Sequence, residues 1–165
     1  MTAEPGLSEI LRTTRSMRRL KPDPVPPGLI QQILEAGTCA ANGGNMQSWR
    51  FLVIRDPAVK AEIGAYYRRA WHEQVGPRYR AGGPAPGNSP EAFARMLNAV
   101  DHLADHIHEA PVWIVPCLIG GTPTRTTGSS IYPAVQNMLL AARALGLGAT
   151  LTTVHLLFEK ETEQA

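Results

Sequence analysis

Two short apolar runs, set among long stretches of helical periodicity, most constrain what this chain can fold into. Residues 49–54 (WRFLVI) and 112–119 (VWIVPCLI) are bounded by turn signals, which is typical of buried strands. Apolar residues recur with the period of a helix in 27–40, 91–109 and 131–145. The sequence therefore predicts a fold that combines helices with a few strands.

Shorter signals predict the remaining elements. Asp56-Pro57 is a cap followed by a proline, which is typical of a helix start. The β-branched residues of 149–154 predict a third strand. In 76–90, glycine and proline make up eight of fifteen residues, so we expect an irregular excursion that acts as a lid.

The composition indicates a single globular domain over residues 1–165. Hydrophobic residues make up 44% of the chain and charged residues 18%, which is too apolar for disorder. The net charge of +2 gives no reason to expect nucleic acid as a partner. Because no apolar run approaches the roughly 20 residues needed to span a bilayer and no signal peptide is visible, we expect no membrane partner and a cytoplasmic location. Cys39 and Cys117, in apolar stretches without a C-x-x-C spacing, are expected to be small core residues.

The first of three candidate binding segments is Arg15-Ser16-Met17-Arg18, within a basic cluster that also contains Arg12. Guanidinium groups and a hydroxyl are the groups that bind a phosphate dianion best. Taken alone, the cluster also fits a solvated basic turn.

The second segment, residues 42–49, combines glycines with three carboxamides. Glycines allow the backbone to approach a planar ring closely, and carboxamides offer both donors and acceptors. Asn42, Gly43, Asn45 and Gln47 are therefore candidates for contacts with the pyrimidine edge of an isoalloxazine. The glycines alone would also fit a helix end followed by a turn.

The third segment is 146–153 (GLGATLTT), whose small residues would leave backbone N–H groups open to a ligand. Such donors would stabilise the charge that reduction places on a flavin. An ordinary turn between a helix and a strand is the alternative interpretation.

The three segments in this order resemble the FMN-dependent nitroreductase superfamily. RSMRRLKPDPVP, AANGGNMQSWRFLVI and YPAVQNMLLAARALGLG carry the resemblance, which covers about residues 13–157. It implies an α+β fold with a mixed, largely antiparallel sheet flanked by helices. It also implies a homodimer with FMN at the interface, NADH or NADPH as co-substrate, and a small-molecule acceptor.

The resemblance also implies roles for individual residues. Arg15, Ser16 and Arg18 match positions that contact the phosphate, ribityl chain and pyrimidine edge. The loop that reaches the flavin from the partner subunit is matched by Ala41, Asn42, Gly43, Asn45 and Gln47. Thr152 and Thr153 match the stretch beside the flavin N5. The chain stops at Ala165, so relative to the family it is expected to lack a C-terminal segment.

The function predicted from the sequence is hydride transfer from NAD(P)H to a nitroaromatic, a quinone or a similar acceptor by a ping-pong mechanism. The protein would supply orientation and charge stabilisation, so no catalytic side chain is assigned. The alternatives are a related reaction (dehalogenation, flavin destruction or deazaflavin use) and a non-enzymatic flavin-storage protein, because a fold does not dictate its chemistry.

Two other groups of residues have alternative interpretations. His102 and His106 lie four residues apart on a predicted helix, which fits either two metal ligands or a solvated helix face, and no metal site is assigned. Trp71 and the Tyr66-Tyr67 pair fit either the roof of a planar substrate site or ordinary packing.

Overall fold

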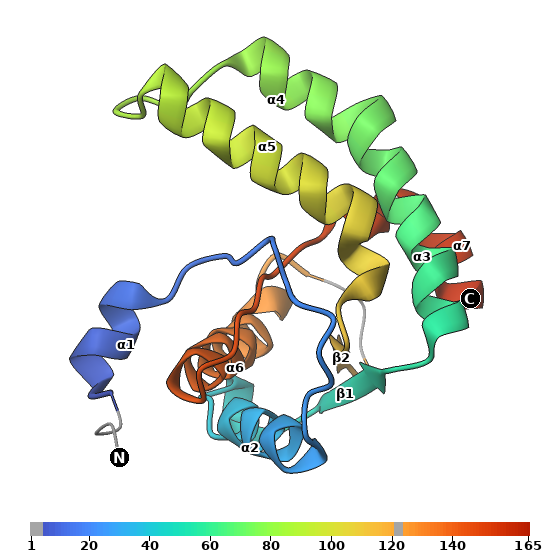
Figure 1. Ribbon diagram of the computed structural model, residues 1–165. Helices are drawn as coiled ribbons and strands as arrows, with labels where there is room; N and C mark the ends of the chain where they lie inside the picture. Colours follow the sequence, from blue (N-terminus) through green and yellow to red (C-terminus); the bar gives the residue numbers. More distant parts are fainter. Residues whose placement is uncertain (1–4, 121–123) are drawn as a thin grey trace. The chain divides into compact units, whose positions relative to one another are not determined.

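The computed structural model describes residues 5–120 and 124–165, which form two compact units. Unit 1 contains residues 5–17, 24–54, 112–120 and 124–151. Unit 2 contains residues 18–23, 55–111 and 152–165. The elements of both are labelled in Figure 1.

Unit 1 is built on an antiparallel pair of strands and two packed helices. Strand β1 (Trp49–Ile54) pairs with β2 (Trp113–Leu118) in a register that sets Trp49 opposite Leu118. These are the two strands of the described part of the chain, and both confirm the sequence prediction. Pro116 lies opposite Phe51 and contributes no N–H to the ladder.

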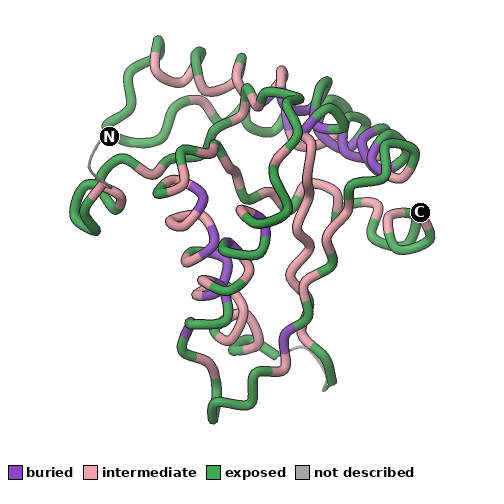
Figure 2. Tube along the Cα trace, turned by 60° about the horizontal axis from the view of Figure 1, so that its bottom comes forward, coloured by how far each residue is buried: buried purple, intermediate pink, exposed green. Residues whose placement is uncertain are grey.

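Helices α2 (Pro27–Thr38) and α6 (Tyr132–Ala144) supply most of the buried core of unit 1. Ile33 of α2 packs with Val135, Met138 and Ala142 of α6. A Cβ atom at Gly37 would lie only 3.0 Å from Cγ of Met138, so the absent side chain lets the two helices approach. Figure 2 shows the buried stretches of the trace. The remaining helices of unit 1 are α1 (Leu7–Thr13) and the 3₁₀ turns η1 (Gly43–Asn45) and η4 (Thr127–Ser130).

Unit 2 is helical. Helix α3 (Pro57–Ala70) starts at Asp56, whose carboxylate accepts hydrogen bonds from the N–H groups of Ala58 and Val59. Helix α5 (Pro90–His106) starts at Ser89 in the same way. Both starts follow the expected rule of a polar cap before proline. Unit 2 also contains the 3₁₀ turns η3 (Ile107–Glu109) and η5 (Val154–Phe158) and the terminal helix α7 (Glu159–Gln164).

A π-helical segment joins α3 to the next helix. This segment, η2 (Trp71–Val75), continues without a break into α4 (Gly76–Gly82). A Cβ atom at Gly76 would lie 2.9 Å from the Trp71 carbonyl oxygen, so the tight path requires glycine. The prediction of an irregular excursion over 76–90 is therefore wrong for 76–82, because Gly76 and Pro77 lie in a first turn, where both are tolerated.

The predicted strand at 149–154 is also wrong. Residues 149–153 are irregular, and η5 begins at Val154. β-Branched residues favour a strand only where a partner strand is available. Among the described residues, this stretch has one backbone hydrogen bond to a distant extended segment, in which the Met17 N–H donates to the Ala149 carbonyl.

Candidate functional site

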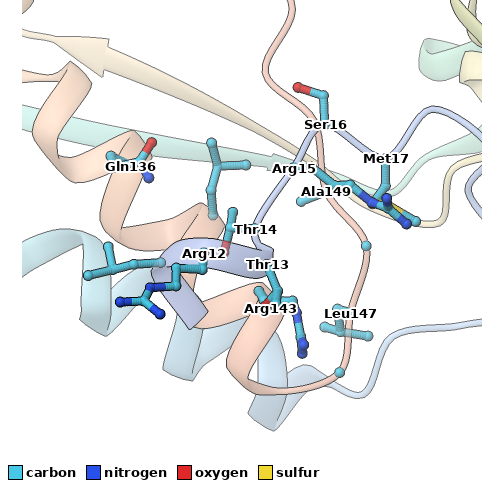
Figure 3. A pocket seen from close by; sticks show the side chains of 14 residues that line it. Arg12, Thr13, Thr14, Arg15, Ser16, Met17, Gln136, Arg143, Leu147 and Ala149 are labelled. Carbon is cyan, nitrogen blue, oxygen red and sulfur yellow. Dashed lines mark hydrogen bonds between the residues drawn. The ribbon is translucent and has the colours of Figure 1, made fainter. Parts of the chain in front are cut away.

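Unit 1 contains a cavity of about 760 Å³ between α1, the segment that follows it and the end of α6. Figure 3 shows the cavity and the side chains around it. The lining residues come from these three parts of the unit: Leu11–Met17, Gln136, Leu139, Arg143 and Gly146–Ala149.

The cavity wall formed by 146–149 is held by the end of α6. Gly146 adopts a left-handed conformation with φ of 76°. Its N–H donates to the Arg143 carbonyl at 3.1 Å, and the Leu147 N–H donates to the Ala142 carbonyl at 2.8 Å. This is the Schellman arrangement, in which glycine ends a helix and satisfies its last carbonyls. Leu147 then packs against the core of unit 1.

The opposite wall is held against α6 by Arg143. Its Nε donates to Oγ1 of Thr13 at 3.0 Å, and Nη2 lies 3.8 Å from the Glu9 carboxylate. The Thr13 hydroxyl in turn donates to the Glu9 carbonyl. The Arg143 side chain is therefore engaged by Thr13 and Glu9, while its positive charge remains at the cavity.

Two arginine side chains and a serine hydroxyl at the cavity have no such partners in the described part of the chain. The guanidinium groups of Arg12 and Arg15 and the Ser16 hydroxyl lack a hydrogen-bonding partner among residues 5–120 and 124–165. The backbone N–H groups of Gly148 and Ala149 are likewise unpaired within the described chain. Unpaired cations, a hydroxyl and backbone N–H groups are the donors that recognise an anion such as a phosphate.

The amide-rich loop is organised by its own side chains. The Asn42 side-chain oxygen accepts from the Gln47 N–H at 2.9 Å, and the Gln47 amide donates to the Asn45 side chain at 3.2 Å. Gly44, Asn45 and Gln47 all have positive φ, a region that glycine and asparagine tolerate best. The Gly43 N–H donates to the Ser130 hydroxyl at 3.1 Å, while Ala41 is exposed between the loop and α2.

The loop lies near the N-terminal end of α6, because Gly43 contacts Ser130, two residues before the helix begins. The cavity lies along α6 from Gln136 to the segment that follows the helix. None of the loop residues lines the cavity, whereas Arg15 and Ser16 do.

The other predicted residues, Arg18, Thr152 and Thr153, belong to unit 2. The Thr152 hydroxyl is hydrogen-bonded to the Tyr67 hydroxyl at 2.9 Å, and Thr153 is exposed before η5. Burial raises the pKa of Tyr67, while the hydrogen bond with Thr152 and the positive charge of Arg18 act in the opposite direction. Common contact of all three segments with one ligand stays a prediction.

Comparison with known proteins establishes the relationship. Residues 11–164 match the sequence profile of the Nitroreductase family. The chain belongs to the nitroreductase family. This confirms the resemblance found from the three segments, and with it the nitroreductase-like α+β fold.

Two curated proteins illustrate the range of this nitroreductase family. A 5,6-dimethylbenzimidazole synthase from Rhodobacter capsulatus is 30% identical over 158 residues, which cover 93% of this chain and 72% of that protein. An NADH dehydrogenase from Thermus thermophilus is 54% identical over 49 residues, which cover 30% of this chain and 24% of that protein.

A solved structure agrees with these matches. A protein from Desulfovibrio desulfuricans, named as a nitroreductase and crystallised in complex with FMN, has a TM-score of 0.67 at 27% identity. The match covers 96% of this nitroreductase-family chain and 74% of that chain. Homodimerisation and a cytoplasmic location stay predictions, and no helix among the described residues is long and apolar enough to cross a membrane.

The sequence did not single out several residues of the cavity in this nitroreductase-family chain. Arg143 is the one charged residue of the apolar helix α6, and the sequence analysis assigned it no binding role. Gln136 lies two turns earlier on the same side. A charged residue in an otherwise apolar helix is a signal that sequence reasoning could have used.

The remaining candidates have structural explanations. Trp71 is buried and donates from its indole N–H to Asp101 at 2.7 Å, and Tyr66 packs against Phe158. His102 and His106 stack with ring centroids 4.4 Å apart, and no cluster of three or more metal-ligating side chains occurs in the described residues. Cys39 and Cys117 are exposed, so the expectation that they are core residues is wrong.

Proposed function

We propose that this protein is an FMN-dependent oxidoreductase that transfers hydride from NADH or NADPH to a small electron-poor acceptor, such as a nitroaromatic or a quinone, by a ping-pong mechanism. The observation that carries the proposal is the set of unpaired donors at the cavity of unit 1, formed by Arg12, Arg15 and Ser16. These groups match the charge and the acceptor atoms of the FMN phosphate.

The size and composition of the cavity also support a phosphorylated cofactor. Its volume of about 760 Å³ lies within the range of about 300 to 1,000 Å³ that is usual for small-molecule sites. Leu139 and Leu147 add apolar surface beside the basic groups. A ligand with an anionic end and an apolar body therefore fits the residues present.

In this proposal Arg15 and Ser16 hold the phosphate, with Arg12 and Arg143 adding positive charge. The N–H groups of Gly148 and Ala149 supply further fixed donors, because the Schellman end of α6 orients this segment before any ligand binds. The FMN itself would supply the hydride chemistry when it is bound.

The amide-rich loop suggests how a second copy would participate. The loop contacts Ser130 before α6, and none of its predicted contact residues lines the cavity of its own chain: Ala41, Asn42, Gly43, Asn45 and Gln47. The proposed homodimer would bring these residues to the cofactor of the partner subunit. Arg18, Thr152 and Thr153 are proposed to contact the same cofactor.

The proposal is tested by purifying the full chain and recording its visible absorption spectrum, with mass identification of any chromophore released. We expect a flavin spectrum, FMN in the released fraction, and oxidation of NADPH or NADH when a quinone is added. A protein that remains colourless after incubation with FMN contradicts the proposal. Tight FMN binding without turnover of any nicotinamide supports flavin storage instead.

A second candidate reaction follows from the relatives. The match to 5,6-dimethylbenzimidazole synthase extends over 93% of the chain, which favours formation of that product as the alternative. Reduced FMN is incubated in air with the protein, and the mixture is analysed for 5,6-dimethylbenzimidazole by mass spectrometry. Appearance of this product with no quinone reductase activity would replace the first proposal by the second.

A further inference from the structure

Tyr67 is a buried tyrosine whose hydroxyl has a polar partner. It lies on α3 with only 2% of its surface exposed, yet its hydroxyl faces a polar partner, Oγ1 of Thr152, at 2.9 Å. From the sequence, Tyr67 fits either the roof of a planar substrate site or ordinary packing. The structure connects it to one of the predicted flavin contacts.

The hydrogen bonds around this pair dictate where its protons lie. Tyr67 is buried, and Thr152 is its hydrogen-bonding partner within the described residues, so the phenol proton has Thr152 as its acceptor. A reversed bond would leave the phenol proton buried and unpaired, which is unfavourable. Tyr67 therefore donates and Thr152 accepts.

The second lone pair of Thr152 also faces a donor. The N–H of Val154 points at the same oxygen at 3.5 Å, which is a long contact. A threonine hydroxyl has one proton and two lone pairs. Tyr67 and Val154 donate to the two lone pairs of the Thr152 oxygen. The Thr152 hydroxyl can therefore interact with a ligand only by donating its own proton.

We propose that Tyr67 is a positioning residue that makes the Thr152 hydroxyl a hydrogen-bond donor toward bound FMN, and thereby sets the relative affinity for oxidised and reduced cofactor. The inference rests on the proposed function, in which Thr152 lies beside the flavin N5. Oxidised flavin accepts a hydrogen bond at N5, whereas reduced flavin carries a proton there. A donor at this place favours the oxidised form.

Arg18 contributes to the same arrangement. Its positive charge acts on Tyr67, so the phenol lies within the electrostatic range of a second predicted flavin contact. Because burial raises the pKa of Tyr67, the phenol keeps its proton at neutral pH and remains a donor. One buried tyrosine thus interacts with both Thr152 and Arg18.

The test compares full-length wild type with Tyr67→Phe, Thr152→Val, Thr152→Ser and the double variant Tyr67→Phe/Thr152→Val. The dissociation constant of oxidised FMN is measured by fluorescence quenching, and the midpoint potential of bound FMN by equilibration with a reference dye. Tyr66→Phe is the matched control, since Tyr66 is the neighbouring tyrosine of α3 and the hydroxyl that this change removes makes a long 3.5 Å hydrogen bond to Glu62 at the surface.

We expect Tyr67→Phe to free Thr152 as an acceptor and to shift the ratio of the two dissociation constants about tenfold toward reduced FMN. For a two-electron couple this equals about 30 mV in the positive direction. Thr152→Ser should behave as wild type, because it keeps the hydroxyl. In the Thr152→Val background, Tyr67→Phe should have no further effect.

Several results overturn the inference. A change below threefold in Tyr67→Phe, a shift of the opposite sign, or an equal effect of Tyr66→Phe would each do so. If Tyr67→Phe does not fold, equal potentials for Thr152→Val and Thr152→Ser overturn it instead. Wild type that fails to bind FMN overturns the proposed function together with this inference, whereas bound FMN with an unchanged ratio overturns the inference alone.

Discussion

The backbone N–H of Met17 donates to the carbonyl of Ala149 at 2.9 Å. This bond joins the arginine segment to the segment that follows α6, and it depends on no side chain. One connection between the two walls of the cavity is therefore made by the main chain, in addition to the contacts of the Arg143 side chain. Side chains such as Arg15 can be replaced there without removing this connection.

Replacing Arg15 by Ala should weaken FMN binding about ten- to a hundredfold. The guanidinium has no partner among the described residues, so its hydrogen-bonding capacity is free for the phosphate, and a charged hydrogen bond contributes about 1.5 to 3 kcal/mol. Quenching of FMN fluorescence at two salt concentrations measures the loss. Arg78→Ala, which removes an exposed arginine of α4, is the control. Equal weakening by both changes would mean that only overall charge matters.

Gly146 should tolerate asparagine better than alanine. Its φ of 76° disfavours residues with a Cβ, and asparagine is the least penalised of them. We expect Gly146→Ala to lower the free energy of unfolding by about 1 kcal/mol and Gly146→Asn by less, as measured by urea denaturation. Gly28→Ala, in α2 with nothing within 4 Å of the added carbon, should instead be neutral or stabilising. The same sign for both alanine variants would contradict this account.

Replacing Lys60 by Met should destabilise unit 2. Lys60 is 6% exposed, and its ammonium donates to the Ala110 carbonyl at 2.8 Å. Methionine fills much of the space but leaves this carbonyl unpaired, which costs about 1 to 3 kcal/mol in urea denaturation. Lys160→Met at the exposed α7 should change stability by less than about 0.5 kcal/mol. A more stable Lys60 variant would show that the desolvation cost of the ammonium outweighs its hydrogen bond.

Asp101 should contribute to stability in a pH-dependent way. Burial raises the pKa of this carboxyl, but hydrogen bonds from Trp71 and Arg80, with the charge of Arg80, lower it overall below its ordinary value of 3.8. A lowered folded-state pKa stabilises the fold above the ordinary value, and this contribution is lost as the pH falls from about 4 through the folded-state pKa.

Asp101→Asn should therefore lower stability by about 1 kcal/mol at pH 7, since the site is partly exposed, and its stability should depend less on pH below 4. Urea denaturation at pH 7, 4 and 3 measures both effects. Asp23→Asn, at an exposed carboxylate without a partner in the described chain, should leave the wild-type profile in place. Parallel pH profiles for wild type and Asp101→Asn would refute the role of the ion pair.

Elements with local signals could be predicted from the sequence. Asp56-Pro57 starts α3, Trp49–Ile54 forms β1, and the apolar repeat of 131–145 forms α6, because a cap, a compact apolar run and a helical period act within a few residues. Residues 76–82 show the converse. The glycine and proline content of 76–90 predicted a loop, but 76–82 form a helix in which Gly76 packs closely against Trp71.

For the candidate site, the sequence by itself determined the chemical groups: arginines and a hydroxyl at 15–18, carboxamides at 42–47, and small residues ending in threonines at 146–153. Only the tertiary structure decided which of them are free. Arg15 is unpaired at the cavity, Arg143 is bonded to Thr13, and Thr152 is bonded to Tyr67, 85 residues away. Hydrogen bonds between residues far apart in the chain follow from packing, which local preferences cannot specify.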